Sequence, residues 1–441
     1  MTTDPRQWLP AAGVDWTDEA DVVVSRSIDR SGWPPSGVPA AVVFPRDAAD
    51  VRRTLRLAND ARTPVVPRGA GTSLTGASTA GTGTVVLDLG RMNRIVALSP
   101  EDATVVVEPG VITADVDRAA AGHGLRYAPD PASHEISTIG GNIATNAGGL
   151  RCAKYGVTRD SVLGLDVVLA DGRQISTGAT TLKSVSGYDL TGLFVGSEGT
   201  LGVVVRATLR LRPAPLATTT IAASFADIAT AAAASVAVTG ARVQPVIAEL
   251  LDEATLTAID AAQGTSLRSR GAALLILQTE GAGEADLVAA VLREPAVAVE
   301  VSTDGTDLLA ARRLALPSIE RLGRPLIEDI AVPRSRLADA VLQIAAIAER
   351  HDVPICTLAH AGDGNLHPII VTADDDLARR TAGDIFELAL KLGGTLTGEH
   401  GIGTLKRPWL GRELGPAAHA LQRQLKDLFD PYGILNPGKA I

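Results

Sequence analysis

Residues 138–149 read Thr-Ile-Gly-Gly-Asn-Ile-Ala-Thr-Asn-Ala-Gly-Gly, so that four glycines and two asparagines occur within twelve residues. Both residue types weaken helices and strands, and the composition therefore predicts an irregular loop. Because glycine has no side chain, a dense glycine run allows the backbone to approach a ligand closely. We interpret this stretch as ligand-contacting backbone, with a plain surface loop as the alternative.

Two further glycine-rich stretches lie on either side of it in the sequence. Residues 67–77, Pro-Arg-Gly-Ala-Gly-Thr-Ser-Leu-Thr-Gly-Ala, follow a predicted strand, do not match G-x-G-x-x-G and lead into another strand. A Rossmann dinucleotide site needs a helix at that point and is excluded, whereas clustered backbone N–H groups can still hold a phosphate. Residues 196–205, Gly-Ser-Glu-Gly-Thr-Leu-Gly-Val-Val-Val, open a buried strand. Taken alone, either loop could also be a simple turn.

The chain alternates short β-branched runs with amphipathic helical stretches, which indicates an α+β fold. In the first part, strands are predicted at 63–67, 84–89, 104–108 and 165–170, and helices at 48–60 and 113–122. The Pro-rich stretch 211–216 is typical of a domain boundary. Beyond it, helices are predicted at 226–239, 284–293, 335–350, 374–392 and 415–429, and strands at 273–278 and 353–358.

Composition excludes several classes of protein. The 441 residues are 46% apolar and 21% charged, as in globular proteins with large cores, and the net charge of −9 argues against a nucleic-acid partner. The two cysteines, Cys152 and Cys356, cannot build a disulfide framework. We find no signal peptide and no apolar run of the roughly 20 residues that span a bilayer. We expect a cytoplasmic protein without a transmembrane segment, and leave open peripheral docking on a membrane.

Three of the seven histidines fall in two short motifs. His360 and His367 stand on either side of a Gly-Asp-Gly turn, and Glu399 and His400 follow between glycines. Two histidines and a carboxylate with an open position suit a catalytic divalent metal such as Zn, Mn or Fe. The alternative is a set of isolated polar side chains satisfied by the backbone, and the spacing alone leaves both interpretations open.

Six motifs, in this order, resemble the vanillyl-alcohol-oxidase/PCMH flavoprotein superfamily. The likeness is greatest to its FAD-dependent D-2-hydroxyacid dehydrogenase branch, which includes glycolate oxidase catalytic subunits, D-lactate dehydrogenases and D-2-hydroxyglutarate dehydrogenases. The motifs lie at 67–73, 139–149, 196–202, 360–367, 398–403 and 430–438, and so extend over nearly the whole chain. The resemblance implies a PCMH-type FAD-binding domain at 1–215, rejoined by 405–441. It also implies an α+β cap domain of the FAD-linked oxidase C-terminal type at 216–404, carrying the metal and the base.

By this resemblance, the 67–77 loop binds the FAD pyrophosphate, 138–149 lines the ring and ribityl chain, and 196–205 approaches the adenine. Relatives that tether FAD covalently use a histidine in the first loop or a cysteine in the second. Thr72 stands at the first position and Cys152 lies beyond the second motif, so we predict non-covalent FAD. The implied cofactor-binding residues are Pro67, Arg68, Gly69, Ala70, Gly71, Thr72, Ser73, Gly76, Pro131, Thr138, Gly141, Asn142, Ala144, Thr145, Gly148, Gly149, Glu198, Gly202, Val203 and Asn436.

The resemblance also implies roles in catalysis. It makes His360, His367 and Glu399 the ligands of a divalent metal, most simply zinc with Mn or Fe as alternatives, and His400 the base. Moving a hydride from the α-carbon to flavin N5 requires the hydroxyl to lose its proton, which a metal and an imidazole both assist. We favour Arg312 over Arg313 as the partner of the substrate carboxylate, which a guanidinium binds through two parallel hydrogen bonds. An ordinary solvated helix arginine is the alternative for both.

We therefore expect oxidation of a small D-2-hydroxy acid such as D-lactate or glycolate. Relatives that act on dicarboxylates have polar or cationic residues downstream of the arginine, whereas Leu314, Leu316 and Ile327 are apolar, which weakens the D-2-hydroxyglutarate alternative. An oxygen-using alcohol or sugar oxidase of the same fold and an inactive flavin-binding subunit are the rival functions. The electron acceptor (a quinone, an electron-transfer flavoprotein, a cytochrome or a partner subunit) and a homodimeric state are left open.

Overall fold

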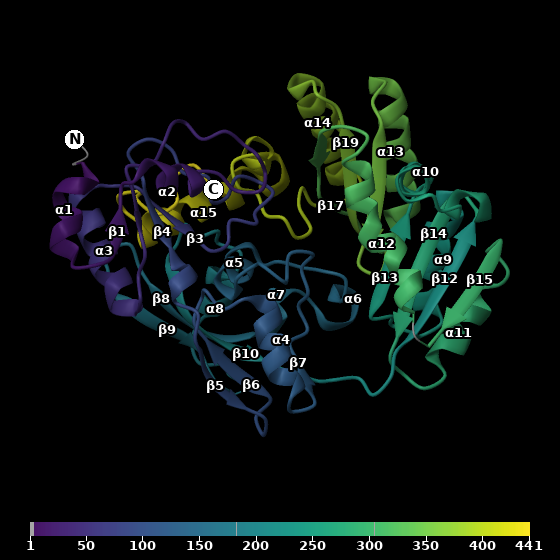
Figure 1. Ribbon diagram of the computed structural model, residues 1–441, viewed down its shortest axis with the longest axis horizontal. Coiled ribbons are helices and arrows are strands. Elements are labelled where there is room, and N and C mark those ends of the chain that lie inside the picture. The colour runs from purple at the N-terminus through teal and green to yellow at the C-terminus, as the bar shows by residue number, and fades with distance from the viewer. Residues whose placement is uncertain (1–3, 182, 304) are drawn as a thin grey trace. The chain divides into compact units, whose positions relative to one another are not determined.

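The computed structural model describes residues 4–181, 183–303 and 305–441, and the chain divides into two compact units (Figure 1). The first unit contains the residues up to Gly149, Gly156–Ala214 and Glu399–Ile441. The second contains Leu150–Tyr155 and Pro215–Gly398. The chain thus leaves the first unit twice and returns to it twice, and each unit mixes helices with sheets, which confirms the α+β class.

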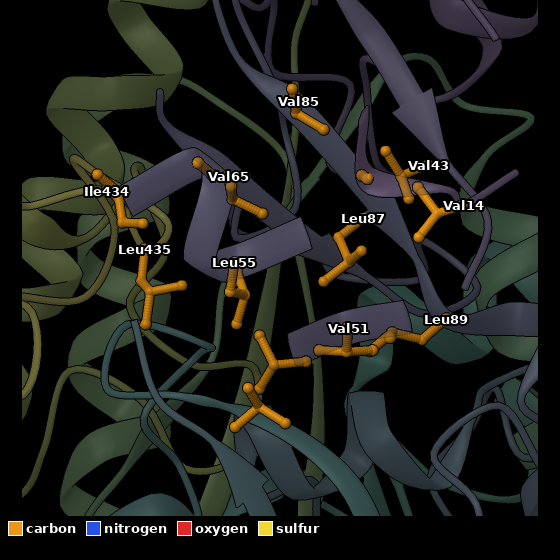
Figure 2. Packing of buried hydrophobic residues seen from close by; sticks show 14 of the residues in the cluster. Val14, Val43, Val51, Leu55, Val65, Val85, Leu87, Leu89, Ile434 and Leu435 are labelled. Atoms are coloured by element: carbon orange, nitrogen blue, oxygen red, sulfur yellow. The ribbon is translucent and has the colours of Figure 1, made fainter. Parts of the chain in front are cut away.

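A four-stranded sheet and its helices form one layer of the first unit, in the strand order β1-β2-β4-β3. The strands are β1 (Trp16–Thr17), β2 (Ala41–Val43), β3 (Val65–Arg68) and β4 (Val85–Asp88), and the helices α1 (Pro5–Ala12), α2 (Ala20–Ser25) and α3 (Ala48–Ala61). β2, β4 and β3 are parallel. Figure 2 shows Val51 and Leu55 of α3 in one apolar cluster with Val65, Val85 and Leu87 of the strands.

The C-terminal segment belongs to this same core. Ile434 and Leu435 are almost fully buried in the cluster (Figure 2). The amide of Val65 donates to the carbonyl of Ile434 at 2.7 Å, and the amide of Asn436 donates to the carbonyl of Val65 at 2.8 Å. The C-terminal segment therefore lies alongside β3, next to the start of the glycine-rich stretch 67–77.

A five-stranded antiparallel sheet forms the other layer of the first unit, in the order β5-β6-β10-β8-β9. These strands are β5 (Ile95–Ser99), β6 (Thr104–Val107), β8 (Val162–Val168), β9 (Gln174–Gly178) and β10 (Val203–Arg210). A second apolar cluster joins β6, β8 and β10 to α4 (Thr113–Ala121), α5 (Ile139–Thr145) and α8 (Leu190–Phe194). The remaining elements are η1 (Leu89–Arg91), β7 (Leu125–Arg126), α7 (Thr158–Ser161), β11 (Arg212–Pro213) and α15 (Arg407–Phe429), which is kinked at Gly415.

The second unit is built on a sheet in the order β15-β12-β14-β13-β18-β19-β16, with β17 also paired to β19. Its strands are β12 (Thr219–Phe225), β13 (Ile247–Leu251), β14 (Ala273–Thr279), β15 (Ala298–Ser302), β16 (Pro325–Ile327), β17 (Ile330–Ala331), β18 (Ile355–His360) and β19 (Asn365–Val371). Its helices are α6 (Cys152–Tyr155), α9 (Ile228–Gly240), α10 (Glu253–Gln263), η2 (Leu267–Arg270), α11 (Glu284–Leu292), α12 (Thr306–Ile319), η3 (Arg334–Arg336), α13 (Leu337–His351) and α14 (Asp375–Lys391). One face of the sheet packs on α10 and α12 in a single apolar cluster. Side chains alternate between the two faces of a strand. Ile221 and Leu275, which flank members of this cluster along their strands, are also buried, so the opposite face is covered too.

The predicted helical ranges lie within a few residues of α3, α4, α9, α11, α13, α14 and the second part of α15, whereas α1, α10 and α12 were not predicted. The prediction for 138–149 was wrong. Those residues include α5, whose N-cap Thr138 accepts a hydrogen bond from the amide of Gly141 and whose C-cap Asn146 has a φ of 54°. Side-chain capping at one end and a left-handed residue at the other stabilise a short helix that its glycines would disfavour. Among the described residues, no helix is both long and apolar enough to cross a membrane.

Candidate functional site

The loop that follows β3 borders a cavity of about 350 Å³ in the first unit. Arg68, Gly69, Ala70 and Thr138, all expected to bind the cofactor, line it together with Gly110. The glycine-rich stretches 67–77 and 138–149 therefore meet at one cavity. A Cβ added to Gly69 would come 2.3 Å from Thr138 Oγ1, so glycine at this position allows the loops to approach closely.

Arg68 supplies positive charge at this cavity. Its side chain is only 7% exposed, and Nη1 has no hydrogen-bond partner among the described residues. Burial lowers the pKa of Arg68, while Asp29 and Asp88 attract its charge and oppose that effect. Asp88 itself forms an ion pair with Arg26 at 2.7 Å. A buried guanidinium beside a glycine-rich loop fits a diphosphate, which would supply the missing acceptor.

Backbone geometry makes the same loop suitable for an anion. Gly71 and Gly76 have φ values of 73° and 77°, in the left-handed region that favours glycine. At Gly71 a Cβ would come 2.0 Å from Nη2 of Arg68, so a side chain there would displace the guanidinium. Ser73 Oγ accepts from the amides of Thr75 and Ala77, which fixes the turn.

Several residues expected to bind the cofactor have protein partners. Glu198 accepts hydrogen bonds from the amides of Ile402 at 2.7 Å and Gly403 at 2.9 Å. Asn436 Nδ2 donates to the carbonyls of Ala77 at 2.9 Å and Glu198 at 2.7 Å. These two side chains tie the 67–77 loop, the 196–202 loop and the returning chain together.

Packing accounts for other members of that set. Asn142 Nδ2 donates to Thr113 Oγ1 at 2.6 Å, and Val203 belongs to the apolar core. A Cβ on Gly149 would come 2.3 Å from the carbonyl of Asp130, and one on Gly202 would come 2.5 Å from Val167. For these four residues the structure gives a local reason for the residue type.

In the second unit, β18 and β19 form a hairpin that presents His360 and His367. The ring centroids lie 5.0 Å apart with the planes at 84°, and both residues are 5% exposed. One ring nitrogen of each lies within 4.8 Å of the other. The turn between them is tight, since the amide of Gly364 donates to the carbonyl of His360 at 3.0 Å and Gly364 has a φ of 89°. The turn therefore brings the two predicted imidazoles together.

A buried carboxylate that the sequence analysis missed lies next to His360. Glu249 of β13 is fully buried, and its Oε1 lies 2.5 Å from His360 Nδ1. Its Oε2 accepts from Arg312 Nε, also at 2.5 Å. Burial favours a raised pKa for Glu249, but attraction and hydrogen bonds from His360 and Arg312 outweigh it, and the pKa lies below its ordinary value. A lone acid within the apolar run Ile-Ala-Glu-Leu-Leu was the available sequence signal.

His367 also has an acidic neighbour that the sequence analysis missed. Asp329 is fully buried, and its Oδ1 lies 3.9 Å from His367 Nδ1. Its Oδ2 accepts from Thr397 Oγ1 at 2.5 Å. Thr397 stands two residues before Glu399, where the chain passes from the second unit to the first. The segment that leads to Glu399 and His400 is thus anchored beside His367.

The other predicted catalytic residues differ in their surroundings. Arg312 has a side chain 17% exposed and is held by Glu249, whereas Arg313 is exposed. The backbone carbonyl of His400 accepts from Thr75 Oγ1 at 3.4 Å, within the first unit. Glu399 is the first residue of that unit's returning segment.

The apolar residues downstream of Arg312 do not report on the substrate. Leu314, Leu316 and Ile327 pack against the apolar cluster on one face of the sheet of the second unit. Core packing is sufficient to explain their apolar character. They therefore give no evidence for choosing between monocarboxylate and dicarboxylate substrates.

Comparison with protein families assigns both parts of the chain. Residues 39–178 match the family described as FAD binding domain, and residues 214–440 match FAD linked oxidases, C-terminal domain. Solved structures with a similar fold include p-cresol methylhydroxylase, at a TM-score of 0.80 and 17% identity over 99% of this chain and 96% of that one. 4-Ethylphenol oxidase from Gulosibacter chungangensis aligns at a TM-score of 0.76 and 20% identity, covering 99% and 97%.

Similar sequences come from bacteria, archaea and plants. The glycolate oxidase subunit GlcD of Bacillus subtilis is 44% identical over 91% of this chain and 89% of that protein. A D-lactate dehydrogenase of Archaeoglobus fulgidus is 35% identical, covering 97% and 99%. A mitochondrial D-lactate dehydrogenase (cytochrome) of Arabidopsis thaliana is 34% identical, covering 92% and 74%. With a cavity suited to a diphosphate, a matching fold and these relatives, the chain belongs to the FAD-linked oxidases of the PCMH-type flavoprotein superfamily and is an FAD-dependent oxidoreductase.

Proposed function

We propose that this protein oxidises a small D-2-hydroxy acid, such as D-lactate or glycolate, to the 2-oxo acid. The observation that carries the proposal is the buried contact from Arg312 through Glu249 to His360, beside His367. It joins a cation suited to a carboxylate with a pair of imidazoles suited to a metal or a proton. The names of the relatives from Bacillus subtilis and Archaeoglobus fulgidus support the same substrate class.

Arg312 is our candidate for binding the substrate carboxylate. Its Nε is bound to Glu249, and among the described residues its Nη groups make no hydrogen bond. Two Nη donors can hold a carboxylate through two hydrogen bonds. This contact would place the α-carbon and its hydroxyl at a fixed distance from the guanidinium.

The metal would be held by His360, His367 and Glu399. The two imidazoles already lie together, and two histidines with a carboxylate are ligands that zinc, manganese and iron accept. Glu399 follows Gly398, where a Cβ would come 2.4 Å from the Asn365 side chain at the start of β19. Gly398, the residue before Glu399 in the chain, therefore lies against the hairpin. A divalent ion there would lower the pKa of the substrate hydroxyl.

His400 would accept the hydroxyl proton, because a neutral imidazole is the side chain best matched to proton transfer near neutral pH.

FAD, when bound, supplies the redox chemistry by accepting the hydride at N5. We propose that FAD is held without a covalent bond, since Thr72 occupies the loop position where a tethering histidine would stand. Acid precipitation should then release all flavin into the supernatant, and flavin that stays with the pellet would contradict this.

The substrate proposal is tested by dye-linked oxidation of D-lactate, L-lactate, glycolate and D-2-hydroxyglutarate by the FAD-loaded protein. We expect turnover of D-lactate or glycolate and little or none of L-lactate. Activity on D-2-hydroxyglutarate far above that on D-lactate and glycolate would contradict the proposed substrate.

Metal removal tests the second part of the proposal. Dialysis against a chelator should abolish most hydroxy-acid oxidation while leaving the flavin spectrum unchanged, and added zinc or manganese should restore it. If metal analysis finds no divalent ion in the dialysed protein and the activity persists, an oxidase of the same fold without a metal would be favoured.

A further inference from the structure

Glu249 lies directly opposite His360 in the sheet of the second unit, since the register of β13 and β18 pairs these two residues. Directly opposed residues on neighbouring strands point to the same face, with Cβ atoms about 5 Å apart. Glu249 is fully buried, and both of its oxygens are hydrogen-bonded, one to His360 and one to Arg312. The strand register thus fixes Glu249 beside His360, and helix α12 supplies Arg312.

We propose that Glu249 is a positioning residue that sets the tautomer of His360 and the orientation of Arg312 at the same time. This inference rests on the proposed function, because it assigns His360 to a metal and Arg312 to the substrate carboxylate. Glu249 itself would touch neither the metal nor the substrate. One buried carboxylate would couple the two binding elements of the site.

The acceptor character of the Glu249 carboxylate would set the tautomer of His360. An ionised carboxylate only accepts hydrogen bonds, so His360 Nδ1, 2.5 Å from Glu249 Oε1, carries the hydrogen. In neutral imidazole the other nitrogen, Nε2, then has the lone pair that a metal requires. Metal-ligating histidines commonly donate their second nitrogen to a carboxylate, and removing that partner weakens metal binding about 10–100-fold.

The planar shape of guanidinium would let Glu249 set the orientation of Arg312. Glu249 Oε2 binds the Nε edge of Arg312, which leaves the two Nη groups as the pair of donors facing away from that carboxylate. The hydrogen bond at Nε restricts the rotamers of Arg312 before substrate binds. The entropy cost of ordering this side chain on binding is therefore smaller. Substrate affinity should therefore depend on Glu249 although it does not contact the substrate.

Replacement of Glu249 by glutamine separates this role from simple space filling. Glutamine has nearly the same shape, but its amide offers one acceptor and one donor group. If the amide oxygen faces His360, the NH₂ group opposes the Nε–H of Arg312. If the oxygen faces Arg312, the NH₂ group donates to Nδ1 and moves the imidazole hydrogen to Nε2. Glutamine can therefore preserve either the Nδ1–H tautomer of His360 or the hydrogen bond to Arg312, but not both.

The test compares FAD-loaded wild type, Glu249→Gln and the matched control Glu280→Gln. Glu280 is a carboxylate of the same unit with a side chain only 7% exposed, paired with Lys154 at 3.0 Å. We would measure zinc affinity by chelator competition, and KM and kcat for D-lactate and glycolate. We expect Glu249→Gln either to bind zinc about 10–100-fold more weakly or, at saturating zinc, to show a KM raised about tenfold or more. Glu280→Gln should match wild type in both.

The outcomes separate the inference from the proposed function. If wild type binds no divalent metal and oxidises no hydroxy acid, the proposed function fails and the inference fails with it. If wild type does both and Glu249→Gln keeps wild-type zinc affinity and KM, the proposed function stands and the positioning role is wrong. If Glu280→Gln loses as much as Glu249→Gln, a general effect of removing a buried acid explains the result, and the positioning role is again wrong.

A measurement on the unsubstituted protein covers the case in which Glu249→Gln does not fold. Long-range proton–nitrogen NMR of protein labelled with ¹⁵N-histidine distinguishes the two neutral imidazole tautomers, and His360→Gln identifies the signal. After metal removal we expect His360 to remain in the Nδ1–H form, because Glu249 holds that hydrogen. The Nε2–H form would overturn the inference.

Discussion

At the scale of single residues, the side chains of Arg68, Glu198 and Glu249 are ionisable and almost fully buried. An unpaired buried charge costs several kcal/mol, so each requires a compensating interaction. Glu249 has Arg312 and His360, and Glu198 has two backbone amides. For Arg68 Nη1, which has no hydrogen-bond partner among the described residues, we propose that the cofactor supplies it.

Arg68→Met should weaken FAD binding without destabilising the flavin-free protein. Loss of a charge-assisted contact with the diphosphate should raise the Kd about 10–100-fold. The flavin-free variant should be at least as stable as wild type, because a buried, incompletely paired charge has been removed. FAD titration and chemical denaturation measure the two quantities. Arg173→Met, at an exposed ion pair with Asp171, serves as the control; equal Kd values for Arg68→Met and wild type would contradict the assignment.

Glu198 should make the stability of the flavin-free protein depend on pH. Burial raises its pKa to about 7 from the ordinary 4.5, against the opposing effect of the amides of Ile402 and Gly403. Between these two values the folded state binds more protons than the unfolded state, so stability falls as the pH rises through that window. In Glu198→Gln this loss is absent. The unfolding free energy of the variant minus that of wild type should therefore increase by up to about 3 kcal/mol across the window.

Chemical denaturation at a series of pH values measures this difference. Glu101→Gln, at an exposed position of the same unit, is the control and should show a constant offset from wild type. A Glu198→Gln offset that does not change with pH, or that decreases as the pH rises, would show that the buried carboxyl does not titrate as proposed.

At the scale of elements, the sequence predicted those features that depend on local pattern. The helices α3, α4, α13 and α14 follow from amphipathic spacing, and the turn between His360 and His367 follows from its glycines. The prediction of an irregular loop failed at α5, because capping by Thr138 and Asn146 outweighs the poor helix propensity of glycine. Glu249 could not be assigned, because its partners lie 63 and 111 residues away and are brought to it by helix α12 and by the pairing of β13 with β18.

The close approach of Gly69 to α5 gives a prediction for this pair of elements. Gly69→Ala should lower FAD affinity, because the new Cβ would come 2.3 Å from Thr138 Oγ1 and push the 67–77 loop away from α5. Thr138→Ala alone should cost about 1 kcal/mol of stability through loss of the N-cap. In the double variant the obstructing oxygen is gone, and FAD affinity should recover relative to Gly69→Ala.

FAD titration of the four proteins gives the coupling between the two sites. Gly240→Ala is the control, since a Cβ there meets nothing within 4 Å. Additive losses in the double variant would mean that Gly69 is required for a reason other than its contact with Thr138.

At the scale of the whole molecule, the C-terminal segment packs into the core formed by the N-terminal strands. Leu435 lies in the same buried cluster as Val65 and Leu87, and the adjacent Asn436 holds two loops of the candidate cofactor site. The family resemblance gave this return of the C-terminus to the first unit as an expectation. The hydrophobic pattern alone could not, because a short apolar pair at a chain end does not reveal its distant partners.

Leu435→Ala should therefore destabilise the first unit by about 2–5 kcal/mol, the usual cost of a cavity in a packed core. Leu428→Ala, at a residue 72% exposed in α15, should change stability by less than about 0.5 kcal/mol. Denaturant unfolding of the flavin-free protein measures both. Equal, small effects would mean that the C-terminal segment does not contribute to the core in solution.

We propose that this chain uses FAD to oxidise a D-2-hydroxy acid. The visible absorption of its flavin under anaerobic conditions is the most direct test. The purified, FAD-loaded protein would receive D-lactate, L-lactate, glycolate and D-2-hydroxyglutarate in separate cuvettes. We predict that D-lactate or glycolate bleaches the flavin band and that L-lactate does not. A flavin band that none of these acids bleaches, or a folded protein that takes up no FAD, would contradict it.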